Sequence, residues 1–178
     1  VEDTIKKNRF YDICFEQIIY FSKKTYSTLF NNKILNCGNT FGDQYFYLIS
    51  HFTHLNKNSI ANFKKENFKT TNLGTLFPEM NIQLKKLKEI YDEAEKLWFW
   101  GAARKTVMIL HHFTECYKLA LDFSKFGCVD QNNFKENKYL PSTKIKVLFA
   151  KNFLRKVKEN DIIIVSNPLY RNEIEKYL

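Results

Sequence analysis

Arg104 and His111 are the residues whose types and spacing most invite a chemical interpretation. Arginine offers phosphate a planar fork of donors, and histidine exchanges a proton near neutral pH. Both belong to the stretch 97–113, LWFWGAARKTVMILHHF, and on a helix turning about 100° per residue they point along one charged face. That face also carries Glu115, Lys118 and Asp122. We therefore expect a solvated stripe stabilised by side-chain pairs one turn apart, with catalysis as the lesser interpretation.

Other groups of candidate functional residues give weaker signals. His51 and His54 are spaced as zinc ligands on a helix can be, but no cysteine or acidic residue is close in sequence. We interpret them, and His112, as polar residues flanking an apolar face. The chain has no Gly-rich phosphate loop, no G-x-S-x-G and no recognisable general acid–base pair. We expect no metal, no cofactor and no enzymatic activity.

An aromatic run, Trp98, Phe99 and Trp100, precedes Gly101. Neighbours on a helix point about 100° apart, so three aromatic side chains in a row cannot all face one core. We expect at least one of them to be exposed or at an interface, where tryptophan is favoured. Gly101 allows a bend in the helix. This cluster is the first place where we expect contact with a partner or a membrane.

Lys144, Lys146, Lys151 and Arg155 form a second candidate interaction surface, on a basic amphipathic segment. Such a helix can lie on an anionic membrane, and the alternative is an ordinary solvated outer face. The net charge of +9 comes almost entirely from lysine, with only four arginines. It therefore favours anionic surfaces in general, or plain solubility, over specific recognition of nucleic acid.

Glycine and proline, which interrupt helices and strands, are scarce: the 178 residues contain five glycines and three prolines. This scarcity predicts long secondary-structure elements. Apolar residues recur at helical spacing in segments 2–36, 40–68, 79–125 and 141–158. The run 162–165, IIIV, suits a strand, but no partner strand is visible, and we interpret it as a buried continuation. Asn167 and Pro168 begin a last short helix. The sequence therefore predicts an all-α antiparallel four-helix bundle with a very long third helix and a short C-terminal helix, as a single domain over 1–178.

Four cysteines, Cys14, Cys37, Cys116 and Cys128, have no zinc-site spacing. Disulfides and buried free thiols both remain open. The sequence contains no run of 18 apolar residues, so no transmembrane helix is predicted. Val1 as first residue allows for a leader peptide that precedes this sequence.

The residue usage, rich in Lys, Asn, Ile, Phe and Tyr, is typical of AT-rich genomes, including malaria parasites, clostridia, poxviruses and slime moulds. With the expected bundle and the four cysteines, the chain resembles the small secreted sporozoite proteins of malaria parasites that act in host-cell traversal. The resemblance implies a non-enzymatic, monomeric protein of a secretory organelle, then extracellular, that contacts a host-cell membrane or a parasite or host protein. Reorganisation of the bundle would present apolar stripes to lipid.

Two alternatives stay open. The spacing of Arg104 and His111 resembles that of the HEPN ribonucleases, small helical bundles, and implies an RNA-cleaving site assembled at a dimer interface. A Bcl-2-like helical adaptor would need a surface groove around a hydrophobic central helix, and the partly charged central segment argues mildly against it.

Overall fold

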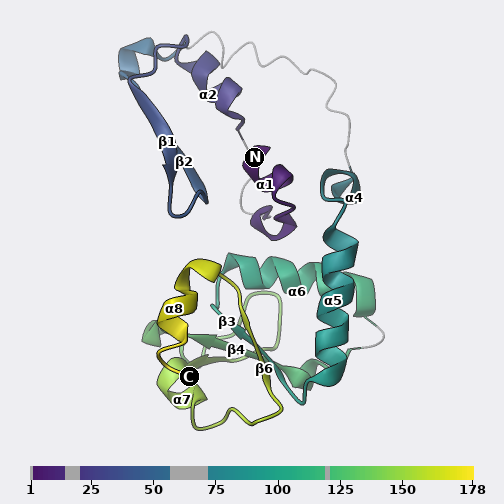
Figure 1. The fold of residues 1–178 in the computed structure, drawn as a ribbon. Coiled ribbons are helices and arrows are strands. Elements are labelled where there is room, and N and C mark those ends of the chain that lie inside the picture. The colour runs from purple at the N-terminus through teal and green to yellow at the C-terminus, as the bar shows by residue number, and fades with distance from the viewer. Residues whose placement is uncertain (1, 15–20, 57–71, 119–120) are drawn as a thin grey trace.

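The computed structural model describes residues 2–14, 21–56, 72–118 and 121–178, and it shows a mixed α/β fold (Figure 1). A four-stranded parallel sheet forms its centre, and a two-stranded antiparallel hairpin lies in the N-terminal part. The predicted all-α four-helix bundle is therefore wrong.

The parallel sheet is built from the C-terminal half of the chain. Its strands are β3 (Leu97–Trp100), β4 (Phe126–Asp130), β5 (Val147–Phe149) and β6 (Ile162–Val165). Their order is β5-β4-β3-β6, so the chain first moves outward from β3 to β5 and then returns to the other side of β3. The direction of winding reverses between β3 and β6, and all four strands end at the same edge.

Burial on both faces explains why LWFW is a strand. Trp98, Phe99 and Trp100 are 4%, 0% and 3% exposed. Successive side chains of a strand point to opposite faces, and here both faces are covered, as is usual for parallel sheets. The expectation that one of these aromatic residues is exposed is therefore wrong, because it assumed a helix with a single core-facing side.

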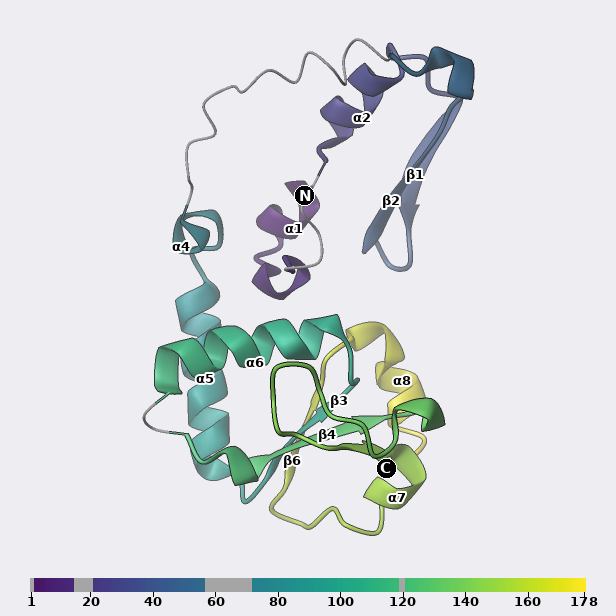
Figure 2. The same ribbon diagram turned by 180° about the vertical axis from the view of Figure 1, so that it is seen from behind.

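Helices cover the two faces as separate layers (Figure 2). On one face, α5 (Met80–Glu93) and α6 (Arg104–Tyr117) pack on Leu97 and Phe99. On the other, α7 (Ala150–Phe153) and α8 (Arg171–Ile174) supply apolar side chains that cover both tryptophans. The β3 strand thus contributes side chains to both cores.

The expected very long third helix is two helices with a strand between them. Helix α5 ends where Ala94 adopts an extended conformation, and Gly101, with φ of +116°, turns the chain from β3 into α6. The expected fourth helix is mostly strand and loop, with only α7 helical. The run IIIV is β6, and its partner is the LWFW strand that the helical interpretation had concealed. A short C-terminal helix is present, formed by η6 (Pro168–Tyr170) and α8.

The N-terminal part is also less helical than expected. It contains α1 (Glu2–Lys6), η1 (Phe10–Asp12), α2 (Lys23–Leu29), η2 (Phe52–His54) and α4 (Leu73–Leu76). Where the second helix was expected lies a hairpin of β1 (Asn36–Thr40) and β2 (Tyr45–Ile49). Its turn reaches toward the carboxyl edge of the parallel sheet (Figures 1 and 2). Residues 15–20, 57–68 and 119–120 of the expected helices lie outside the described residues.

The four cysteines are free thiols, with Cys14 and Cys128 buried and Cys37 and Cys116 exposed. Burial raises the pKa of the Cys128 thiol to about 12. Within the described parts of the chain, no helix is both long and apolar enough to span a membrane.

We predict that Gly127→Ala destabilises the fold. The Trp98 ring lies directly on Gly127, where an added Cβ would stand 2.1 Å from the ring. Overpacking of this kind costs about 1–3 kcal/mol, and urea unfolding measures the loss. Gly74→Ala in α4 is the matched control, because the added Cβ meets only the Asn72 Oδ1 atom, at 3.3 Å. Equal stability of the two variants would contradict this packing.

Candidate functional site

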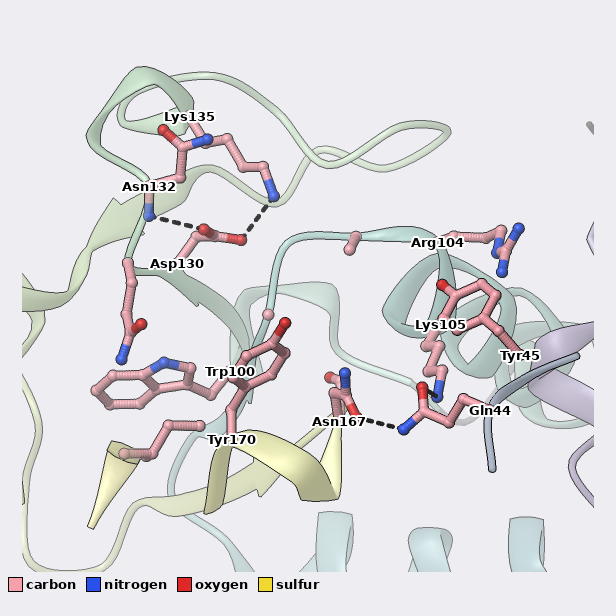
Figure 3. Close-up of a pocket in the computed structure, with 15 residues that line it drawn as sticks. Gln44, Tyr45, Trp100, Arg104, Lys105, Asp130, Asn132, Lys135, Asn167 and Tyr170 are labelled. Carbon is pink, nitrogen blue, oxygen red and sulfur yellow. Dashed lines mark hydrogen bonds and ion pairs between the residues drawn. The ribbon is translucent and has the colours of Figure 1, made fainter. Parts of the chain in front are cut away.

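A cavity of about 800 Å³ lies at the carboxyl edge of the sheet, between the ends of β3 and β6 (Figure 3). Its walls come from the β3–α6 turn, the loop after β4, the loop after β6 and the turn of the N-terminal hairpin. The lining residues include Gln44, Tyr45, Trp100, Gly101, Arg104, Lys105, Asp130, Gln131, Asn132, Lys135, Ser166, Asn167 and Tyr170. A single cavity thus gathers side chains from four separate segments.

The β3–α6 turn brings the start of a helix to the cavity. Gly101 adopts a left-handed φ that side-chain-bearing residues rarely take, and small residues, Ala102 and Ala103, follow it. Ala103 is the N-cap of α6, and no side chain caps this helix. The first turn of a helix presents backbone N–H groups and the positive end of the helix dipole. An anion is the natural partner of such an end.

Asp130, at the end of β4, holds this turn in place. Its Oδ2 accepts hydrogen bonds from the Ala102 N–H and from Lys135 Nζ, each at 2.8 Å, and its Oδ1 accepts from the Asn132 N–H at 2.8 Å. Lys135 Nζ also donates to the Ala102 carbonyl at 2.9 Å. The Asp130–Lys135 ion pair (Figure 3) thus binds both the N–H and the carbonyl group of Ala102, which orients the entry to α6.

Two buried hydroxyls join α6 to β6 beneath the cavity. Thr106 Oγ1 donates to the Gly101 carbonyl at 2.5 Å and lies 2.6 Å from Ser166 Oγ. Because the threonine hydroxyl has one proton and gives it to the carbonyl, Ser166 is the donor in the second bond. The Ser166 N–H also donates to the Trp100 carbonyl at 3.1 Å. The ends of β3, α6 and β6 thus form one hydrogen-bonded unit.

The charge lining the cavity is predominantly positive. Arg104, Lys105 and Lys135 line it with one carboxylate, Asp130, which already pairs with Lys135. Lys105 Nζ lies 3.4 Å from Asp12 Oδ1 and donates to Gln44 Oε1 at 3.1 Å. The first turn of α6 contains no acidic residue, although acids stabilise helix starts and cations oppose the dipole there.

The remaining wall is aromatic and amide. Trp100 is buried but borders the cavity, and Tyr170 is about half exposed beside it (Figure 3). Gln131 Nε2 is buried and, among the described residues, has no hydrogen-bond partner. A buried donor without a partner is costly, so a ligand that accepts from Gln131 would gain affinity.

The sequence-predicted residues separate into several places. Trp100, Gly101 and Arg104 line this cavity. Trp98, Lys144 and Lys146 line a second cavity of about 550 Å³ at the opposite edge of the sheet.

The other predicted residues lie outside both of these cavities. Phe99 is in the core between β3, α5 and α6. Lys151 and Arg155 are exposed and line neither cavity, and His111 lies two turns along α6 from Arg104. His51 and His54 stack edge to face at 5.4 Å, and no group of three metal-binding side chains occurs among the described residues.

Sequence reasoning missed Asp130, Lys105, Lys135, Asn167 and Gln44. The available signal was the buried run FGCV followed by an acid, because acids at the carboxyl ends of parallel strands commonly face a ligand crevice. The helical segment expected over 79–125 ends directly before this run, which was therefore not considered as a strand.

We predict that Thr106→Val lowers the free energy of unfolding by about 1–3 kcal/mol, because it leaves Ser166 Oγ and the Gly101 carbonyl without their buried partner. Chemical denaturation measures the change. Thr114→Val in the same helix is the control, since its hydroxyl donates only to the His111 carbonyl within the helix. A similar effect in both variants would show that the contact with β6 contributes nothing.

No protein-family model matches the chain, and no curated protein sequence or solved structure matches it either.

Proposed function

We propose that this protein binds a nucleotide at the carboxyl edge of its parallel sheet. The observation that carries the proposal is the position of the cavity, where the winding of the sheet reverses between β3 and β6. Open α/β sheets bind their ligands in the crevice at this reversal, outside the carboxyl ends of the strands. A volume of about 800 Å³ is within the range of small-molecule sites.

The phosphates would lie at the first turn of α6. Its N–H groups, Arg104 and Lys105 offer positive charge there. Cations at the positive end of a helix carry a cost for folding, which the Asp12–Lys105 pair offsets in part. A phosphate group at this point would offset that cost. Lys135 and Asn132, on the loop after β4, are placed to bind the sugar, and Tyr170 and Trp100 offer aromatic surface to the base.

The turn departs from the dinucleotide fingerprint G-x-G-x-x-G. Gly101 occupies the first glycine position, but Ala103 and Thr106 occupy the second and third. The second glycine normally allows close backbone approach to a pyrophosphate, and the third allows close packing of the helix on the sheet. Here Thr106 is buried and packs through its hydrogen bonds instead. We therefore propose a nucleotide and name no particular cofactor.

The fold bears on only some of the functions that the sequence led us to expect. Traversal of host cells, secretion and membrane contact stay predictions that nothing in the fold tests. The expected reorganisation of a four-helix bundle does not apply, because the fold is not a bundle. The ribonuclease alternative also stays untested, with only Arg104 of its two residues lining the cavity.

We predict that Lys105→Ala weakens binding of ADP and UDP by roughly 10- to 100-fold, because a hydrogen bond to a charged group is worth about 1.5–3 kcal/mol. Isothermal titration calorimetry measures the affinity. Lys144→Ala is the matched control, because this lysine lines the cavity at the opposite edge. Failure of ADP, UDP and inorganic pyrophosphate to bind at millimolar concentrations, or equal losses in both variants, would contradict the proposal.

A further inference from the structure

The hairpin tip, residues 41–45, comprises the turn between β1 and β2 and the first residue of β2. It reaches the candidate site from the N-terminal part of the chain. Gln44 Oε1 accepts a hydrogen bond from Lys105 Nζ at 3.1 Å, and Gln44 Nε2 donates to Asn167 Oδ1 at 3.0 Å. One side-chain amide therefore bridges the first turn of α6 and the loop after β6 (Figure 3). These are the two walls of the cavity that face each other across the reversal of the sheet.

Few contacts hold the hairpin tip in this position. Besides Gln44, the tip touches Leu169, because the space above Gly42 is filled by that side chain. The strands of the hairpin are mostly exposed and pair with each other. Their other contacts are with neighbouring N-terminal residues: the Leu35 N–H donates to the Ile49 carbonyl, and the Phe46 ring packs against Tyr26 and Lys23. Undocking the tip would consequently break few interactions.

The hairpin tip and an anionic ligand need the same cation. Lys105 already contacts Asp12 and Gln44, and Gln44 and Tyr45 occupy cavity wall beside the first turn of α6. A neutral amide oxygen is a weaker acceptor for an ammonium group than a phosphate oxygen, because a charged acceptor roughly doubles the strength of the bond. A phosphate can therefore displace Gln44, whereas the reverse exchange is unfavourable.

We propose that Gln44 is a built-in competitor for the phosphate site, and that ligand binding releases the hairpin tip from the cavity. The inference rests on the proposed nucleotide site and adds its regulation. Asn167 keeps its capping bond to the Leu169 N–H when the tip leaves, so the loop after β6 retains its shape. Release frees the tip, including the already exposed Phe41 and Tyr45, from Lys105, Asn167 and Leu169 without unfolding the sheet.

The first test compares two substitutions that have opposite expected effects on the affinity for ADP and UDP. Gln44→Ala removes the competing acceptor and is expected to tighten binding about three- to tenfold. Gln44→Glu gives Lys105 a charged internal partner and is expected to weaken binding about tenfold or more. Asn39→Ala is the matched control, since it removes an exposed amide of the same hairpin that does not line the cavity, and it should leave the affinity unchanged.

The second test follows the hairpin tip directly by limited chymotrypsin cleavage after the exposed Phe41. ADP or UDP should accelerate cleavage in the wild type, while Gln44→Ala should be cleaved fast with or without nucleotide. Weaker binding by Gln44→Ala would overturn the proposal, since Gln44 would then hold the ligand. Unchanged affinity in both Gln44 variants, with Lys105→Ala still defective, would also overturn it while leaving the nucleotide site intact. No binding by the wild type and none by Gln44→Ala would overturn both.

Discussion

The burial of four consecutive apolar residues, Leu97–Trp100, is the constraint on which the rest of the structure depends. A segment with no polar side cannot lie at a surface, so it must be covered on both faces. A strand with neighbours on both edges and helices above and below satisfies this demand, and β3 is that strand. Trp98 fits only because Gly127 on β4 leaves space for its ring.

Parallel pairing around β3 then determines where chemistry can occur. Strands that run the same way end together, so the loops after β3, β4 and β6 converge at one edge. Because α6, which follows β3, covers one face of the sheet and α8, which follows β6, covers the other, the segments leaving these neighbouring strands diverge and leave a crevice. Asp130 and the hydroxyls of Thr106 and Ser166 make its floor rigid, since each of these side chains links two of the segments that meet there.

The sequence revealed the helical parts better than the strands. Helices α5 and α6 lie within a segment whose apolar spacing predicts helix, and Gly101 was expected to allow a bend in it. The error lay in continuing the helix through LWFW, since a short continuous apolar run fits a buried strand and a buried helix equally. That step also hid the partner of IIIV. The run Tyr45 to Ile49, YFYLI, is rich in strand-forming aromatic residues and follows the Gly42-Asp43 turn, which fits a hairpin, but segment 40–68 was expected to be helical.

The candidate site was predictable only where a residue's role is local. Arg104 was singled out for its spacing from His111, Trp100 as part of the aromatic run 98–100, and Gly101 as the place of a bend. Asp130 and Lys135 acquire their role from the pairing of β4 with β3, and Gln44 from a hairpin docked across the fold. Such relations depend on register and tertiary contact, which the spacing of residues along one segment does not contain.

Lysine is found at both the amino and the carboxyl edge of the sheet, but its surroundings differ between the two edges. At the amino edge, Lys158 pairs with Glu95 and Lys96 lies over the Trp98 ring at 4.9 Å, so both lysines have partners within the chain. Stability and solubility account for lysines in that position. At the carboxyl edge, Arg104 and Lys105 begin α6, where the dipole opposes them. The first turn contains no acid, and the carboxylate near Lys105 is Asp12 of η1, at 3.4 Å. Positive charge placed at the positive end of a helix dipole is better explained by binding of an anionic ligand than by folding. This difference between the edges supports the proposed ligand site at the carboxyl edge.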